Sequence, residues 1–241
     1  MRIMTARRKC FSIILAVVLA LALSGNPSAL AANGGSQPSR NTAIHLPAEV
    51  IFQNCAEAIF MLETFDEDGE SIRTGSGFFI SDTGLAVTNL HVIDNATSAT
   101  ITLHNGDIYP VMGVNAASKE FNLAIISVES DENDWKHLTL ADSDQIAAGN
   151  TVYVIGSPLG LINTMTAGII SKTSRTVGEE TLIQFTAPIS FGSGGSPVLN
   201  TRGQVIGVAS SSFSYGQHLN LAVPINHVKQ MDPGDPVAFG K

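Results

Sequence analysis

Twelve short apolar runs separated by turn-forming residues constrain the fold of this chain more than any other feature. The runs are rich in β-branched and aromatic side chains, and few segments of the chain have a helical period. They form two sets of six, at 59–65, 77–80, 85–88, 99–103, 108–114 and 123–128, and then at 152–155, 166–172, 182–185, 197–199, 205–209 and 219–223. This series predicts an all-β fold of two six-stranded antiparallel β-barrels.

The segments between the runs divide the chain into domains. Asp68-Gly69, Asp82-Thr83-Gly84 and Asn105-Gly106 provide the left-handed backbone positions that tight hairpins require. A polar stretch at 130–135 separates the two sets, and a short helix is expected near the end, at 224–231. We therefore predict an N-terminal β-barrel at 47–130, a C-terminal β-barrel and helix at 131–232, and a flexible tail at 233–241.

Residues 1–31 have the pattern of a secretory signal peptide. Basic residues from Arg2 to Lys9 precede an apolar run at 11–23, and Ala29-Leu30-Ala31 gives a small-x-small cleavage pattern. The run is shorter than the ~20 residues that span a bilayer, so we expect a secreted protein without a stable membrane anchor. An uncleaved signal anchor is the alternative, and the compartment, whether extracellular, periplasmic or wall-associated, is left open. Residues 32–46 are polar and predict a flexible linker.

Charge and cysteine content exclude several classes of function. The leader holds four of the 13 Lys and Arg residues and none of the 21 Asp and Glu residues, so the remainder has a formal charge of −12. Such a surface repels phosphate backbones, and we expect no nucleic-acid partner. Cys10 lies in the leader, which leaves Cys55 without a disulfide partner and interpreted as a small buried hydrophobe. We expect no metal ion and no cofactor.

Three segments carry residues suited to chemistry. His91 directly follows an apolar run at the end of an expected strand, a position that suits a general base, although a histidine alone is more often structural. The second segment, 119–126, contains Asn122, and the third, 186–200, contains a glycine- and serine-rich loop before Pro197. Upstream, Gly75-Ser76-Gly77 is too short for a phosphate loop and is interpreted as part of a hairpin turn.

The order and spacing of these segments resemble the trypsin/chymotrypsin clan of serine proteases, and most closely the protease domain of the bacterial HtrA/Deg-like peptidases. The resemblance runs from about residue 59 to residue 229. It includes the blocks Gly156–Gly160, Ala167–Ser171, Gly203–Gly207 and Ala222–Ile225. It implies a chymotrypsin-like pair of barrels, serine endopeptidase chemistry without a cofactor, and peptides or unfolded protein segments as partners.

The resemblance also implies roles for individual residues, and two of them depart from the family pattern. The general base falls on His91, the aspartate position holds Asn122, and the nucleophile position holds Gly194. An amide in place of the aspartate can hold the imidazole in the wrong tautomer, at a cost of about 10⁴ in turnover. Loss of the nucleophile costs on the order of 10⁶, and the two losses do not multiply. The oxyanion hole falls on the main-chain N–H groups of Gly192 and Gly194, which neither change removes.

The family pattern places substrate contacts on two further segments. Pro188 occupies the base of the specificity pocket and carries no charge, so a small apolar pocket is expected. The strand that follows Gly207 pairs with the substrate backbone in the family, which implies contacts at Ala209, Ser210 and Ser211.

These residues lead to three hypotheses. The first is a secreted serine protease homologue that retains a peptide-binding cleft but is severely impaired in catalysis. The alternative is an active secreted endopeptidase that uses His91 with a displaced nucleophile, Ser193, which requires a one-residue shift of the loop. A purely structural role is the third, and the oligomeric state is left open.

Overall fold

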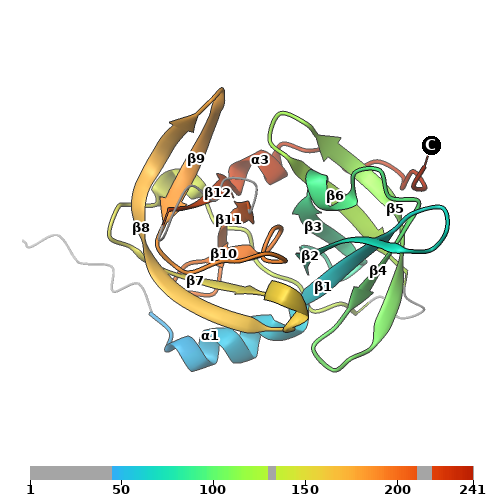
Figure 1. Cartoon of the computed structure of the whole chain (residues 1–241). Helices are drawn as coiled ribbons and strands as arrows, with labels where there is room; N and C mark the ends of the chain where they lie inside the picture. Colours follow the sequence, from blue (N-terminus) through green and yellow to red (C-terminus); the bar gives the residue numbers. More distant parts are fainter. Residues whose placement is uncertain (1–44, 130–133, 211–218, 241) are drawn as a thin grey trace, which may run out of the picture. The chain divides into compact units, whose positions relative to one another are not determined.

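The chain folds into two closed antiparallel β-barrels, as predicted (Figure 1). The computed structural model describes residues 45–129, 134–210 and 219–240. The N-terminal barrel consists of β1 Ile59–Phe65, β2 Ser71–Phe79, β3 Leu85–Asn89, β4 Ser98–Thr102, β5 Ile108–Ser118 and β6 Leu123–Val128. The C-terminal barrel consists of β7 Thr151–Gly156, β8 Thr164–Val177, β9 Glu180–Phe185, β10 Pro197–Leu199, β11 Val205–Ser210 and β12 Asn220–Pro224.

The two barrels have the same strand order. Around the first barrel the neighbours are β1-β2-β3-β6-β5-β4, and around the second they are β7-β8-β9-β12-β11-β10. The helices are short: α1 Ala48–Cys55, α2 Leu90–Ile93 and α3 Asn226–Lys229, with 3₁₀ turns at Ala56–Ala58, Ser143–Gln145 and Pro158–Gly160. The predicted terminal helix is therefore present as α3, although it is shorter than expected.

Three apolar cores explain why several strands are apolar at every position. Phe60 and Ile126 belong to the core of the N-terminal barrel, and Phe185 belongs to that of the C-terminal barrel. A third core unites side chains from both barrels, among them Ile125 of β6 and Val223 of β12. Successive side chains on a strand face opposite sides. A strand that faces a barrel interior on one side and the third core on the other is therefore buried on both sides.

Several strands extend beyond the predicted runs, β2, β5 and β8 by the most, and β5 reaches Ser118 rather than residue 114. The sequence predicts a strand from residue 77, whereas β2 begins at Ser71, and β8 reaches Val177 rather than residue 172. The first four residues of β2 are exposed, and most of β8 is exposed or half-buried. Apolar alternation marks only strands with one buried face, so these solvated extensions gave no signal.

Gly75-Ser76-Gly77 lies inside β2 rather than in a turn. Its three residues pair with Leu62, Met61 and Phe60 of β1 in antiparallel register. The interpretation of this tripeptide as part of a hairpin turn was therefore wrong. The glycines meet a packing need instead, because a methyl group on Gly77 would come within 2.4 Å of the Phe60 ring.

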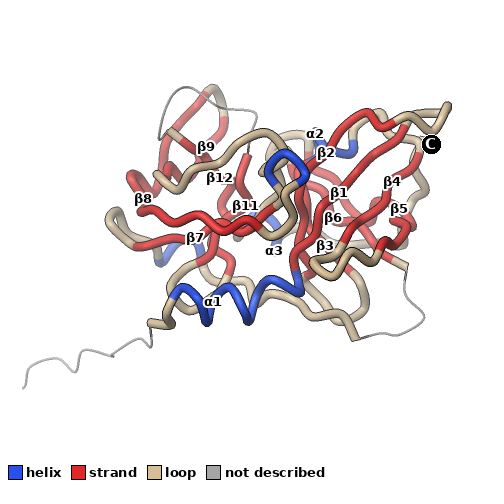
Figure 2. Tube along the Cα trace, turned by 60° about the horizontal axis from the view of Figure 1, so that its bottom comes forward, coloured by secondary structure: helices blue, strands red, loops and turns tan. Residues whose placement is uncertain are grey.

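Helix α1 packs against the C-terminal barrel, although the predicted domain boundaries assign it to the N-terminal one. Ile51 and Cys55 are buried in the third core, and the Cys55 Sγ–H donates to the Gly203 carbonyl at 3.5 Å. Figures 1 and 2 both place α1 beneath β7. Burial raises the pKa of the Cys55 thiol to about 11, which fits the prediction of a buried, unreactive cysteine.

The segment 233–240 crosses in the opposite direction and contacts the N-terminal barrel. Val237 pairs with Val114 of β5, and the main-chain N–H of each residue donates to the carbonyl of the other at 2.9 Å. The ring of Phe239 packs against the core of that barrel. The sequence predicted a flexible tail at 233–241. It did not predict this contact, because a single pair of backbone hydrogen bonds leaves no periodic pattern in the sequence.

Candidate active site

His91 stands at the end of a buried strand, as the sequence predicted. Strand β3 ends at Asn89, and α2 begins at the next residue. The Leu90 N–H donates to the Asn122 carbonyl at 3.1 Å, and so does the Asn89 side-chain amide. These bonds fix the first turn of α2 to the residue that precedes β6. The half-buried His91 side chain is therefore held beside Asn122.

Asn122 adopts the left-handed backbone conformation, with φ of +50°. Asparagine and aspartate tolerate this region better than other residues with a side chain. The Asn122 Oδ1 accepts the main-chain N–H of His91 at 2.9 Å. Because an N–H group must donate to oxygen rather than to the NH₂ group, this bond fixes which way the amide points.

The orientation of the Asn122 amide determines the tautomer of His91. Asn122 Nδ2 lies 2.9 Å from His91 Nδ1, whereas Oδ1 lies 3.2 Å from the same nitrogen. The shorter contact is attractive only when Nδ1 carries no hydrogen and accepts from the NH₂ group. The geometry therefore favours a neutral imidazole with its proton on Nε2, the opposite of what a general base requires.

The environment of His91 also opposes protonation of the ring. Burial is the largest influence and lowers the pKa of His91 below its ordinary value of 6.5. The hydrogen bond with Asn122 raises the pKa, and the Arg73 guanidinium lowers it. The charge of Arg73 is anchored nearby, because its guanidinium donates to the Asp94 carbonyl. Around neutral pH the ring is therefore uncharged.

The loop 190–196 holds the position predicted for the nucleophile. Gly192 and Gly195 have φ of +87° and +88°, a region that favours glycine, and a methyl group on Gly195 would lie 2.1 Å from the Ser76 carbonyl oxygen. Gly194 is not among the residues with positive φ. The backbone therefore favours glycine at positions 192 and 195, but a side chain at 194 itself meets no dihedral penalty.

Gly75 of β2 lies between helix α2 and Gly194 and is close to both. A methyl group on Gly75 would come within 2.6 Å of the Val92 side chain and 3.2 Å of the Gly194 carbonyl oxygen. Val92 is the neighbour of His91 in α2. The structure thus brings the three triad-equivalent positions, His91, Asn122 and Gly194, to one place where the two barrels meet.

The main-chain N–H groups of Gly192 and Gly194 have no hydrogen-bond partner among the described residues. Their neighbours do: the N–H groups of Ser193, Gly195 and Ser196 donate to carbonyls at 2.9 to 3.1 Å. The N–H groups of Gly192 and Gly194 are therefore able to donate to a carbonyl oxygen of a ligand.

Ser193 points into its own turn. Its Oγ accepts the Ser190 N–H at 3.2 Å, and the residue is 4% exposed. It helps to line a cavity of about 180 Å³ that Pro188, Thr166 and Val154 also line, and none of the described residues in this lining is charged. The sequence predicted a small apolar pocket at Pro188, whereas the lining also includes hydroxyl groups. The hydroxyls of Thr164, Thr166 and Ser190 were not expected, because the family pattern gave no role to any of these three residues.

The expected substrate strand is only partly available. The Ala209 N–H donates to the Ser196 carbonyl at 2.8 Å, and the Ala209 carbonyl accepts the Gly195 N–H at 2.9 Å. Both main-chain groups of Ala209 therefore already have a partner within the protein, and its assignment as a substrate contact stays a prediction. Ser210 is the last residue of β11, and its buried Oγ has no partner among the described residues. Ser211 lies outside the described residues.

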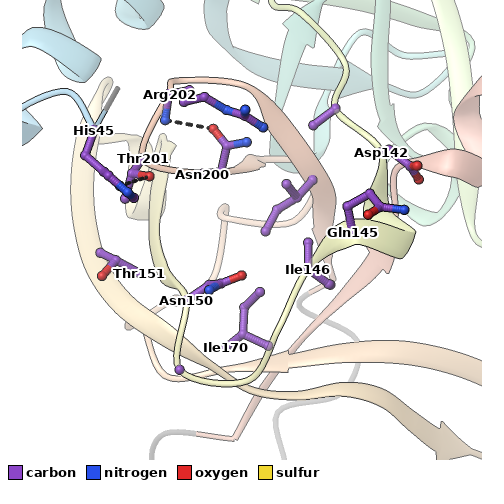
Figure 3. A pocket seen from close by; sticks show the side chains of 13 residues that line it. His45, Asp142, Gln145, Ile146, Asn150, Thr151, Ile170, Asn200, Thr201 and Arg202 are labelled. Carbon is purple, nitrogen blue, oxygen red and sulfur yellow. Dashed lines mark hydrogen bonds between the residues drawn. The ribbon is translucent and has the colours of Figure 1, made fainter. Parts of the chain in front are cut away.

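A larger pocket lies elsewhere on the C-terminal barrel (Figure 3). It measures about 430 Å³, and its floor includes the buried Ile170 and Ile206. His45 and Arg202 stand at its edge, and none of the triad-equivalent positions lines it. Within the described ranges no group of three or more His, Cys, Asp or Glu residues could hold a metal ion.

Comparison with known proteins identifies the family. The model of the trypsin-like peptidase domain matches residues 75–208, more than half of the chain. The chain belongs to this family. Among its relatives, HhoB of Synechocystis sp. is 36% identical over 161 residues, covering 63% of this chain and 38% of its own. The mitochondrial serine protease HTRA2 of Drosophila erecta is 33% identical over 196 residues, covering 74% and 45%.

Solved structures support the same membership. The HtrA-type protease AlgW, solved with a tripeptide, superposes with a TM-score of 0.68 at 29% identity, covering 75% of this chain and 60% of that one. A serine endoprotease from Yersinia pestis, at 24% identity and a TM-score of 0.66, has the same fold and covers 78% and 65%. The chain spans less than half of the length of the curated relatives named above. It is an HtrA-like domain of the trypsin clan.

Proposed function

We propose that this chain is an HtrA-type domain that binds peptides in a protease cleft and is severely impaired in cleaving them. The loop 190–196 carries the proposal, because it presents two open amides and has no side chain at position 194. Carbonyl binding needs only the amides. Covalent attack needs an atom that glycine lacks.

The reaction of a serine protease needs three contributions, and this site supplies one of them. A hydroxyl must attack the peptide carbonyl, an imidazole Nε2 must take the proton, and main-chain amides must stabilise the oxyanion. Gly194 has no hydroxyl, and the contact between Asn122 and His91 favours a proton already on Nε2. Loss of the nucleophile alone lowers turnover by about 10⁶, and the altered tautomer adds little because the triad acts as a unit.

The proposed ligand is an extended peptide segment with a small uncharged side chain. One peptide carbonyl would accept the N–H groups of Gly192 and Gly194, and the adjacent side chain would enter the 180 Å³ cavity at Pro188. The described residues that line this cavity offer no charged partner, so lysine and aspartate side chains would lose hydration without compensation from them. The tripeptide bound by the related AlgW supports a peptide ligand.

We also propose that the domain acts after export from the cell. The proposal rests on the signal-peptide pattern of residues 1–31, which lie outside the described part of the chain. None of the helices in the described ranges has the length and hydropathy of a membrane span. Amino-terminal sequencing of the protein recovered from culture medium or from a periplasmic extract tests this proposal. A protein that still carries residues 1–31 in the cytosol would contradict it.

A binding experiment separates the proposed function from an active protease and from a purely structural role. Isothermal titration with N-acetyl-Ala-Ala-Val, a product-like tripeptide, should show saturable binding, and N-acetyl-Ala-Ala-Lys should bind at least tenfold more weakly. Casein hydrolysis by the same preparation should not exceed that of a His91→Ala variant. Absence of tripeptide binding would favour a structural role, and casein hydrolysis at ordinary protease rates would overturn the claim of impaired catalysis.

No observation in the structure favours the alternative endopeptidase that uses Ser193. A nucleophile needs a free Oγ directed to the imidazole, whereas the Ser193 Oγ accepts the Ser190 N–H. The decisive comparison is Ser193→Ala in any preparation that shows residual hydrolysis. We expect no change in that residual rate. A loss of more than tenfold would restore Ser193 as the nucleophile.

A further inference from the structure

Ser76 connects the N-terminal barrel to the loop of the C-terminal barrel that carries the open amides. It lies in β2, is completely buried, and is 116 residues from Gly192 in sequence. Its Oγ donates to the Gly192 carbonyl at 2.8 Å, and its main-chain N–H donates to the Gly194 carbonyl at 2.8 Å. One residue thus holds the carbonyl groups of both glycines whose N–H groups are open.

The Ser76 hydroxyl also accepts a hydrogen bond. The Ser157 N–H donates to it at 2.9 Å, which satisfies the hydroxyl as donor and as acceptor. Two residues further along, the Leu159 N–H donates to the Phe191 carbonyl at 2.9 Å. Because a peptide group is planar, fixing the Phe191 carbonyl also fixes the direction of the Gly192 N–H. The hydroxyl of Ser76 therefore anchors Gly192 itself and also the segment 157–159, which holds the Phe191 carbonyl. Together these two contacts orient the Gly192 N–H.

The composition of the loop makes such a restraint necessary. Three of the four residues from Gly192 to Gly195 are glycines, which have the largest backbone freedom to lose on folding. Side-chain packing cannot hold a glycine, so hydrogen bonds to its main chain are the available means. The glycine at 194 adds to this freedom, since the family pattern places a serine there.

We propose that Ser76 is a positioning residue that preorganises the Gly192 and Gly194 amides for a ligand carbonyl. The inference rests on the proposed function, because it assigns a purpose to the same two amides. Removal of the hydroxyl leaves the Gly192 carbonyl and the Ser157 N–H without a partner in a buried place. The peptide group between residues 192 and 193 then keeps only the bond from the Ser193 N–H to the Ser190 carbonyl. The segment 157–159, which holds the Phe191 carbonyl, also loses its anchor at Ser157, so the direction of the Gly192 N–H is less firmly fixed.

The test compares Ser76→Ala with Ser143→Ala by amide hydrogen exchange. Ser143 is a matched control, because it is also buried and its Oγ also accepts a main-chain N–H, that of Asn226. We expect Ser76→Ala to accelerate exchange of the bonded Ser193 and Gly195 amides by at least tenfold, while Ser143→Ala leaves them unchanged. Equal exchange in Ser76→Ala and in the unaltered protein would overturn the inference.

Tripeptide affinity and the Ser76→Cys variant provide two further tests. They distinguish a role of Ser76 in positioning the loop from a general loss of stability and from failure of the proposed function. Ser76→Ala should weaken binding of N-acetyl-Ala-Ala-Val about tenfold, and Ser76→Cys, which keeps a weaker donor, should lie between. If Ser76→Ala does not fold, Ser76→Cys carries both measurements, and unchanged exchange and affinity in that variant would overturn the inference. If the unaltered protein binds no tripeptide, the proposed function fails, whereas the exchange data still decide whether Ser76 orders the loop.

Discussion

At the scale of single residues, Asn122 illustrates how one atom alters the chemistry of a neighbour. Its Oδ1 is held by the His91 main-chain N–H, so the NH₂ group is left to face Nδ1 of the ring. A carboxylate in the same place would accept from both groups. The left-handed backbone at position 122 accommodates either residue, so Asn122→Asp changes the charge without strain.

Asn122→Asp should move the proton of His91 from Nε2 to Nδ1. The carboxylate also favours the charged ring, so the pKa of His91 should rise relative to that in the unaltered protein. Nitrogen-15 chemical shifts of the His91 ring, followed through a pH titration, report both changes. A ring already protonated on Nδ1 in the unaltered protein would contradict our reading of the 2.9 Å contact.

Burial of two histidines predicts a loss of stability in mild acid. Desolvation is the main influence that lowers the pKa of His91 and of His227 below 6.5, and nearby Glu120 and Asp144 partly oppose it for His227. The unfolded chain therefore binds protons at a higher pH than the folded chain does. Their contribution to stability is complete above about pH 6.5 and decreases as the pH falls below it.

His227→Gln should reduce this acid sensitivity. The ring of His227 stacks on Phe121 at 3.8 Å, so a charge acquired there is poorly hydrated. Urea unfolding at pH 7.5 and pH 5.0 gives the loss of unfolding free energy for each protein. We expect a smaller loss in His227→Gln than in the unaltered chain, with the exposed His104→Gln as the control. An equal loss in all three proteins would remove His227 from the explanation.

At the scale of elements, the twelve strands were predictable and their connections to the chain ends were not. Apolar runs such as 123–128 predict a strand that is buried on both faces. The exposed start of β2 at Ser71 has no apolar pattern, so the sequence does not predict it. Helix α1 has only two buried side chains, Ile51 and Cys55, which is too short a pattern to detect. The same reason explains the contact of Val237, which is made by backbone atoms alone.

The pairing of Val237 with Val114 predicts different effects for two substitutions. Val237→Pro removes the N–H that donates to the Val114 carbonyl and should lower the free energy of unfolding by about 1–2 kcal/mol. Val237→Ala keeps that donor and trims a side chain that is 57% exposed, so it should cost less than about 0.5 kcal/mol. Urea midpoints of the two variants provide the comparison. Equal midpoints would mean that the segment does not contribute to stability.

The site was predictable to the extent that it depends on spacing along the chain. The positions of His91, Asn122 and Gly194 follow from their motifs, and the structure brings all three together. The role of Ser76 does not follow, because its partner Gly192 is 116 residues away and joins it only when the barrels meet. The hydrogen bonds of Ala209 to Ser196 and Gly195 do not follow either, since strand spacing does not reveal which main-chain groups are already bonded.

At the scale of the whole molecule, the site depends on the contact between two barrels with the same strand order. The N-terminal barrel supplies His91, Asn122 and Ser76, and the C-terminal barrel supplies the loop 190–196 and the pocket at Pro188. The third core joins the barrels independently of any catalytic side chain. The packing of the two barrels therefore does not depend on a side chain at position 194, and the proposed binding domain would keep the fold of a protease.

Restoring serine at position 194 and aspartate at position 122 tests whether these two positions are what impairs catalysis. We predict that Gly194→Ser combined with Asn122→Asp will be labelled by a fluorophosphonate at residue 194 and will hydrolyse casein at least 10³-fold faster than the unaltered protein. Asn122→Asp alone should remain unlabelled. Labelling of the unaltered protein at a single serine, with casein hydrolysis equal to that of the restored variant, would contradict the claim that Gly194 disables catalysis in an otherwise prepared site.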